Sequence, residues 1–174
     1  MVWPPLSRLL RPKPRYRILQ EPVHPRIFLL EHCIEGIIQC ISPEMQRGHE
    51  GVVYLYGQTD GTDTLIAGVI RPEAATSWGS FEVSSLAMAR VVNAVCALGL
   101  KVVGQLHTHP TLAEHSQGDE DGARIAYQGF TSIVLPDYGR HLPSLEGMAA
   151  YMFRDGRFQE LPTAKVYVTP GVLP

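Results

Sequence analysis

The chain has 174 residues, of which 45% are hydrophobic and 18% charged, and its formal net charge is -2. This composition is typical of one soluble globular domain with a substantial core. The near-neutral charge excludes the strongly basic class of nucleic-acid and membrane-surface binders. No stretch approaches the roughly 18 apolar residues of a membrane-spanning helix, and the first residues lack the pattern of a secretory signal. We therefore expect a cytoplasmic protein.

The sequence begins with a proline-rich, basic segment. Four prolines and four basic side chains fall within residues 1–15, a combination that disfavours regular structure. This arm is either a solvated tail or a docking segment for an acidic partner surface. We place a single domain at 16–170, with a short first strand at 16–19.

Apolar residues then recur at helical spacing. Residues 26–41 carry isoleucine and leucine at intervals of three and four, which predicts an amphipathic helix, and Ser42-Pro43 predicts its end. The β-branched and aromatic run 51–57 predicts a strand. A turn separates it from a second strand at 64–70, so the two are expected to form an antiparallel hairpin.

The second half of the chain alternates between the same kinds of element. The predicted order is a loop at 71–79, a helix at 84–97, a strand at 101–106, a helix at 118–128, a strand at 131–135, a loop at 136–147, and hairpin strands at 148–153 and 158–161. Asp155-Gly156 is a strong signal for that last hairpin. This mixture of hairpins and helices predicts a single α/β (α+β) domain. The three scattered cysteines, Cys33, Cys40 and Cys96, are expected to be reduced thiols.

Chemistry-bearing side chains gather in one short stretch. His107-Thr108-His109-Pro110 follows the predicted strand 101–106, and Ser116 and Asp119 come next, all within thirteen residues. Because side chains two apart on a strand point to the same face, His107 and His109 should project together. A carboxylate can complete a three-ligand metal site and leave a fourth position for water.

Three interpretations of this stretch compete. The histidines can be ordinary hydrogen-bonded residues, with Ser116 and Asp119 forming a capping box at the start of a helix. Alternatively, the cluster is a hydrolytic metal site, or a two-histidine, one-carboxylate iron site. Ligand types alone do not separate the last two, but hydrolysis also needs a general base and an oxyanion partner.

The pattern His107-x-His109-Pro110 with Ser116-x-x-Asp119 resembles the signature of the JAB/MPN (JAMM) metalloproteases. The resemblance extends to Glu50, which stands before a strand and after a helix, and it covers roughly residues 20–160. It implies an MPN/JAB-like single domain whose mixed β-sheet has flanking helices, in cytidine-deaminase-like layers. It also indicates a bacterial-type, deubiquitinase-like member.

The chain departs from that signature in its loop. Six residues separate His109 from Ser116, fewer than in the eukaryotic deubiquitinating members. Asp119 keeps the Ser-x-x-Asp spacing, although Asp121 remains an alternative third ligand. His115 has no counterpart in the signature and is expected to be a surface loop residue or a contact to substrate.

The resemblance implies a mechanism. His107, His109 and Asp119 would hold one Zn²⁺ ion and a water in a tetrahedral site. Glu50 would act as the general base, and Ser116 would hydrogen-bond the developing oxyanion.

The implied substrate is an amide or isopeptide bond after the C-terminus of a ubiquitin-like protein. We expect the loops 71–79 and 136–147 to flank its groove, with Trp78 or Tyr138 packing on the tail. Ubiquitin-activating and ubiquitin-conjugating homologues are the implied partners. The alternatives are a non-catalytic MPN-type scaffold and a processing peptidase for sulfur-carrier proteins of the ubiquitin-like fold.

Overall fold

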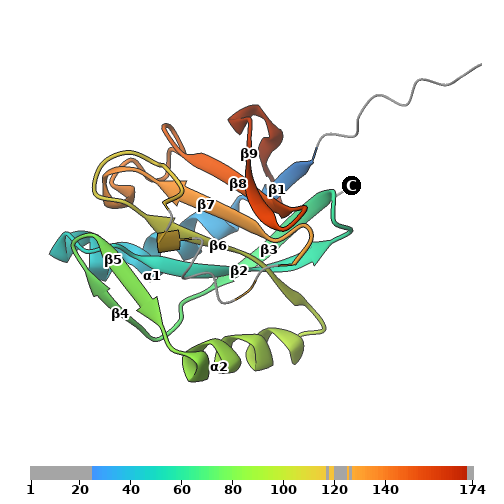
Figure 1. The fold of residues 1–174 in the computed structure, drawn as a ribbon, viewed down its shortest axis with the longest axis horizontal. Helices are drawn as coiled ribbons and strands as arrows, with labels where there is room; N and C mark the ends of the chain where they lie inside the picture. The colour runs from blue at the N-terminus through green and yellow to red at the C-terminus, as the bar shows by residue number, and fades with distance from the viewer. Residues whose placement is uncertain (1–24, 117, 120–124, 126, 172–174) are drawn as a thin grey trace, which may run out of the picture.

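An eight-stranded mixed sheet forms the body of the molecule (Figure 1). The computed structural model describes residues 25–116, 118–119, 125 and 127–171. Its elements, in chain order, are β1 (Arg26–Leu30), α1 (His32–Arg47), β2 (Val52–Thr59), β3 (Asp63–Ile70), β4 (Ala74–Ser77), β5 (Ser80–Val83), α2 (Ser85–Cys96), β6 (Lys101–Thr108), β7 (Thr131–Leu135), β8 (Ala149–Arg154), β9 (Arg157–Leu161) and β10 (Val166–Thr169).

The sheet has the strand order β10-β1-β3-β2-β6-β7-β8-β9, and β4 pairs with β5 in a separate hairpin. Three neighbouring pairs are parallel (β10 with β1, β1 with β3, and β6 with β7), and the other pairs in this sheet are antiparallel. The prediction of a single α+β domain with a mixed sheet is confirmed.

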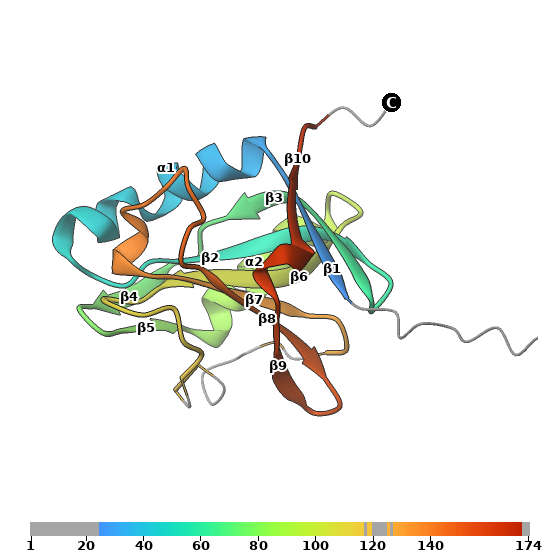
Figure 2. The same cartoon turned by 90° about the horizontal axis from the view of Figure 1, so that it is seen from above.

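The two helices cover opposite faces of this sheet (Figure 2). Alternating side chains of β2 divide between two apolar clusters. Val53 and Leu55 pack in the cluster that includes α1, whereas Val52 and Tyr54 pack in the cluster that includes α2. Because β2 and β6 lie at the centre of the sheet, both are covered on each face.

The helix predicted at 26–41 begins and ends later in the structure, where α1 spans His32–Arg47. Residues 26–30 form β1, where Ile27 and Leu29 are fully buried between β10 and β3. The helix α1 also continues through Pro43. A proline inside a helix costs about 3 kcal/mol, but burial of Ile41 and Glu44 on either side of it holds the last turns against the sheet.

The region between β3 and α2 is a hairpin, not the predicted loop. Residues 74–77 pair with 80–83, and Trp78-Gly79 forms the turn. The small alanine, serine and threonine residues of β4 give a weak strand signal. The strand β10 was also not predicted.

Other predictions were confirmed. The β2–β3 hairpin, α2, β6, β7 and the β8–β9 hairpin lie within a few residues of their expected bounds. The basic arm 1–15, the strand 16–19 and most of the helix 118–128 lie outside the described residues. Within the described part of the chain, no helix is long and apolar enough to cross a membrane.

A bulge in β6 determines which side chains face α2. Leu55 pairs with Gly104 and Tyr56 with Val102, so Val103 is an extra residue without a partner in β2. Such a bulge resets the alternation of the strand. His107 therefore emerges on the face that carries α2 and the β4–β5 hairpin, where its ring lies 5.3 Å from that of Phe81.

Candidate metal centre

The end of β6 positions the two histidines. His107 pairs with Val52 on one side and Val134 on the other. His109 follows the strand, and its backbone N–H donates to the carbonyl of Leu135 at 2.9 Å. The two rings lie 5.0 Å apart, centroid to centroid, which confirms that they project to the same side.

Asp119 reaches these rings from the segment that follows, where residues 118 and 119 are helical. Its carboxylate oxygen Oδ2 accepts the backbone N–H of Ser116 at 2.7 Å, and its own N–H donates to Ser116 Oγ at 3.2 Å. This reciprocal pair is a capping box. The capping interpretation and the metal-ligand interpretation are therefore compatible, because the cap orients the carboxylate toward the histidines.

The three side chains fit a metal ion. Asp119 Oδ1 lies 3.2 Å from His107 Nε2, and Asp119 Oδ2 lies 3.4 Å from His109 Nε2. One ligand atom from each residue lies within 4.8 Å of the others. His107 Nδ1 is buried, and among the described residues it has no hydrogen-bond partner, which is costly unless something else binds it. The alternative ligand Asp121 lies outside the described residues.

The charges of the site suit a cation. Burial alone would raise the pKa of Asp119, but hydrogen bonds from His107 and His109 lower it well below its usual range. Burial lowers the pKa of His107 and keeps its ring neutral, whereas the hydrogen bond to Asp119 raises that of His109. Metal ligands bind as an ionised carboxylate and neutral imidazoles, so these shifts favour the ligand states of Asp119 and His107, whereas His109 would release any bound proton on binding an ion.

Glu50 lies beside this cluster because β2 begins where β6 ends. Gly51 N–H donates to Thr108 Oγ1 at 2.8 Å, and Thr108 N–H donates to the Gly51 carbonyl at 3.0 Å. Glu50 is 5% exposed, and burial raises the pKa of its carboxyl to about 7, a shift that nearby His109 opposes and Asp119 supports. A carboxylate with a pKa near neutrality can both accept and return a proton.

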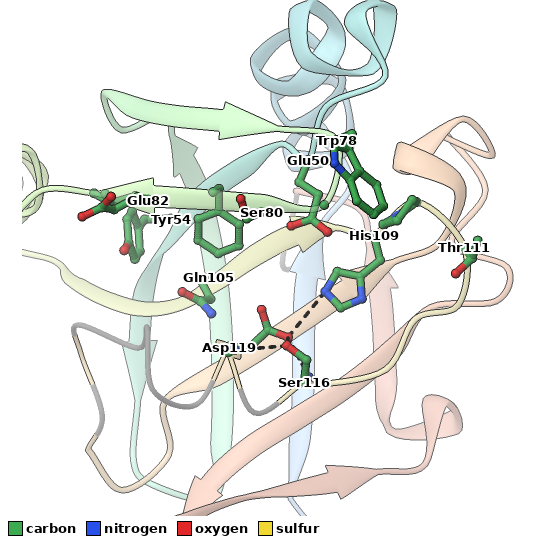
Figure 3. Close-up of a pocket in the computed structure, with 15 residues that line it drawn as sticks. Glu50, Tyr54, Trp78, Ser80, Glu82, Gln105, His109, Thr111, Ser116 and Asp119 are labelled. Carbon is green, nitrogen blue, oxygen red and sulfur yellow. Dashed lines mark hydrogen bonds and ion pairs between the residues drawn. The ribbon is translucent and has the colours of Figure 1, made fainter.

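A cleft of about 380 Å³ joins these groups (Figure 3). Glu50, His109, Ser116 and Asp119 line it, and the β4–β5 hairpin forms one wall. Trp78 lines its mouth from the hairpin turn, with 73% of its surface exposed. Tyr138 is not among the lining residues; its hydroxyl donates to the backbone carbonyl of Trp78 at 2.8 Å.

The inner wall of the cleft contains side chains that the sequence did not single out. Tyr54, Phe81 and Gln105 line it from β2, β5 and β6. Each lies within a strand, where no local pattern marks it as a site residue. Only the pairing of strands that are distant in sequence brings the three side chains to the cleft.

His115 differs from its prediction as a surface residue. Its ring packs against Tyr151 and Phe158, at 4.9 and 4.6 Å between centroids, and both ring nitrogens are buried with no hydrogen-bond partner among the residues that the structure describes. Burial lowers the pKa of this histidine to about 4. The aromatic residues of the β8–β9 hairpin, far along the chain, cover it.

No protein-family model matches the sequence. The chain is 25% identical over 143 residues to "Probable metalloprotease y4jG" of Sinorhizobium fredii, an alignment that covers 79% of this chain and 88% of that protein. This similarity agrees with the buried cluster of His107, His109 and Asp119, which could hold a metal ion. The chain therefore resembles a probable metalloprotease.

Two solved structures are similar to the chain. The solution structure of protein DSY2949 from Desulfitobacterium hafniense matches with a TM-score of 0.64 at 15% identity, covering 84% of this chain and 94% of that one. AF2198, a JAB1/MPN domain protein from Archaeoglobus fulgidus, matches with a TM-score of 0.46 at 17% identity, covering 82% and 98%. The first of these matches shows that the fold is shared with that protein. The candidate metal site of this chain lies at the end of the central strand β6.

Proposed function

We propose that the protein is a zinc-dependent peptidase or isopeptidase that hydrolyses the amide bond after the C-terminus of a ubiquitin-like protein. The observation that carries the proposal is the shared cleft. A buried glutamate, Glu50, lines the same cavity as His109 and Asp119, and His107 completes the ligand set. A metal site with an adjacent general base is suited to hydrolysis, whereas oxygen activation does not need such a base.

His107, His109 and Asp119 would hold the ion through two imidazole nitrogens and one carboxylate oxygen. Three protein ligands of these types, with one position left open, are typical of catalytic zinc. When bound, zinc supplies a Lewis acid that brings the pKa of a coordinated water to about 7.

Glu50 would carry the proton. Its carboxylate lies in the cleft and accepts a proton from the attacking water, then returns it to the departing amine. The position of Glu50 directly before β2 keeps its backbone fixed, since its N–H donates to the Ser77 carbonyl at 2.8 Å. A base held in this way loses little entropy on reaching its reactive geometry.

Ser116 would stabilise the oxyanion. Its hydroxyl donates to Asp119 Oδ2 at 2.8 Å, so the hydroxyl must turn from this carboxylate toward the substrate oxygen during the reaction. A bound cation would share the charge of Asp119 and weaken the competing hydrogen bond.

The substrate proposal follows from the shape of the cleft. All four residues of β5 line it, and an extended peptide can add to a strand edge of this kind. Trp78 offers an exposed aromatic surface at the mouth, where it would pack on the tail of the ubiquitin-like protein. Ubiquitin-activating and ubiquitin-conjugating homologues would be partners of such an enzyme.

The test combines metal analysis with a cleavage assay. Purified protein is analysed for bound metal by mass spectrometry and incubated with ubiquitin-like proteins that carry a C-terminal reporter peptide. Glu50→Gln should abolish hydrolysis and retain zinc, because it removes the base and no ligand. His109→Ala should lose both.

Other results would redirect the proposal. Full activity of Glu50→Gln would exclude this residue as the base. Bound zinc without cleavage of any fusion would favour the non-catalytic scaffold. Cleavage restricted to sulfur-carrier fusions would identify a processing peptidase.

A further inference from the structure

The segment that follows β7 has an unusual backbone. Three consecutive residues have positive φ: Asp137 at 48°, Tyr138 at 55° and Gly139 at 78°. Glycine adopts this left-handed conformation freely, but a bulky side chain such as tyrosine seldom does. Residues in such conformations persist only when the surrounding structure holds them, and they concentrate at functional sites.

One end of this segment is anchored in the core. Gly139 is buried, and a Cβ atom there would lie 2.8 Å from Ile41 Cδ1 of helix α1. Its N–H donates to the Pro136 carbonyl at 2.9 Å. The positive φ of 78° favours glycine here, and the close approach of Gly139 to α1 leaves little space for a side chain.

Tyr138 contacts two walls of the cleft at once. Its backbone N–H donates to the carbonyl of His109 at 2.8 Å, and its hydroxyl donates to the carbonyl of Trp78 at 2.8 Å. The guanidinium of Arg140 lies over its ring, 5.3 Å from the centroid. These contacts connect a metal ligand directly to the turn of the β4–β5 hairpin.

The hairpin packs on the core through Val83 and Phe81, but it has few hydrogen bonds to the rest of the described residues. Its two strands pair with each other and with no strand of the main sheet. Besides this pairing, Glu50 N–H donates to Ser77, and His49 Nδ1 lies 3.3 Å from Thr76 Oγ1; both contacts are on β4. Within the described residues, the Tyr138 hydroxyl is the hydrogen-bond partner of the turn itself from outside the hairpin.

We propose that Tyr138 is a positioning residue that fixes the β4–β5 turn, and with it Trp78, at a set distance from His109. Its left-handed backbone directs the N–H toward one wall of the cleft and the side chain toward the other. Tyr138 thus acts on substrate binding through Trp78 rather than by packing on the tail itself. The proposal rests on the proposed function for its kinetic consequence, but its structural part is independent of catalysis.

The test removes a single oxygen atom. Tyr138→Phe deletes the hydroxyl and keeps the ring and the backbone bond to His109. Tyr127→Phe is the matched control, because the Tyr127 hydroxyl also donates to a backbone carbonyl at 2.8 Å, that of Val102, away from the hairpin. Hydrogen exchange of residues 74–83 is measured in metal-free protein, and KM, kcat and zinc affinity are measured with the reporter fusion.

Tyr138→Phe should speed exchange of residues 74–83 about two- to tenfold, the range that one hydrogen bond controls. It should raise KM by a similar factor, with kcat and zinc affinity within about twofold of wild type. Tyr127→Phe should leave the exchange of 74–83 unchanged. A general loss of packing would instead alter both variants alike.

Equal exchange of the hairpin in Tyr138→Phe and wild type would overturn the proposal, whether or not the protein hydrolyses the fusion. If exchange accelerates but no fusion is cleaved by wild type, the positioning role stands and the proposed substrate fails. A fall in kcat with unchanged KM would contradict positioning through Trp78.

Discussion

The metal ligands are held in two different ways. His107 lies within β6 and His109 directly after it, where backbone hydrogen bonds to neighbouring strands fix them. Asp119 comes from a segment outside the sheet, where Ser116 contacts both its carboxylate and its backbone N–H. The strand-borne ligands therefore depend on the stability of the whole sheet, whereas the position of Asp119 also depends on one local capping interaction.

The largest effect is expected where the sheet holds β6. A Cβ atom at Gly104 would lie 2.1 Å from Thr131 Oγ1 and 2.7 Å from the Thr131 carbonyl oxygen. Because Thr131 is fully buried, it has no room to move. Gly104→Ala should lower the free energy of unfolding by about 3 kcal/mol, measured by urea denaturation.

Gly79→Ala is the control for this substitution. A Cβ atom there has no neighbour within 4 Å, so the stability should change by less than about 0.5 kcal/mol. If both variants were equally stable, the sheet would not constrain the strand-borne ligands as described.

A smaller effect is expected where Ser116 holds Asp119. Ser116→Ala removes the hydroxyl that contacts Asp119 twice, and loss of an outer partner of this kind typically weakens metal binding 10–100-fold. Zinc titration against a competing chelator measures it. Ser144→Ala, which removes an Oγ that accepts the Glu146 N–H, should leave zinc affinity unchanged; equal affinities in the two variants would refute the local role of Ser116.

The smallest effect is expected in the pH dependence of the free energy of unfolding that Glu50 causes. Burial raises the pKa of its carboxyl from 4.5 to about 7, so the folded protein binds this proton more tightly than the unfolded chain. The contribution of Glu50 to stability is therefore lost as pH rises from about 4.5 to 7. Glu50→Gln removes the titration and should make metal-free protein more stable than wild type by on the order of 1 kcal/mol at pH 8.

Denaturation curves at pH 5 and pH 8 in the presence of a chelator test this expectation. The advantage of Glu50→Gln should be smaller at pH 5 than at pH 8. Glu82→Gln, a change at an exposed carboxylate of the same cleft, provides the comparison. An advantage that grew toward acid would show that burial does not disfavour the ionised form of Glu50.

Local sequence signals predicted the parts of the fold that depend on local structure. Asp155-Gly156 marked a hairpin because its turn geometry requires such residues. The helix prediction for Arg26–Leu30 was wrong because the apolar residues of this run suit a helix as well as a strand. Only the pairing with β3 and β10 makes it a strand. The helix α1 continues through Pro43 because the burial of side chains on both sides outweighs the free-energy cost of a proline inside a helix.

The same distinction applies to the site. The spacing of His107 and His109 and the capping pattern of Ser116 and Asp119 are local, so the sequence placed them correctly relative to each other. The residues alone gave no reason to bring Glu50 there; the family resemblance did. The contact of Tyr138 with Trp78 depends on two loops sixty positions apart, and no spacing rule predicts it.

The junction of Gly51 with Thr108 has a further consequence for folding. These residues are 57 positions apart, and the pairing of β2 with β6 that brings Glu50 to the histidines closes that long loop of chain. Contacts between distant segments form slowly, since loop closure costs entropy before any contact repays it. The same pairing also holds His107 beside Val52, so the glutamate and the strand-borne histidine reach their places through one long-range step, and a chain that has not made this pairing lacks both.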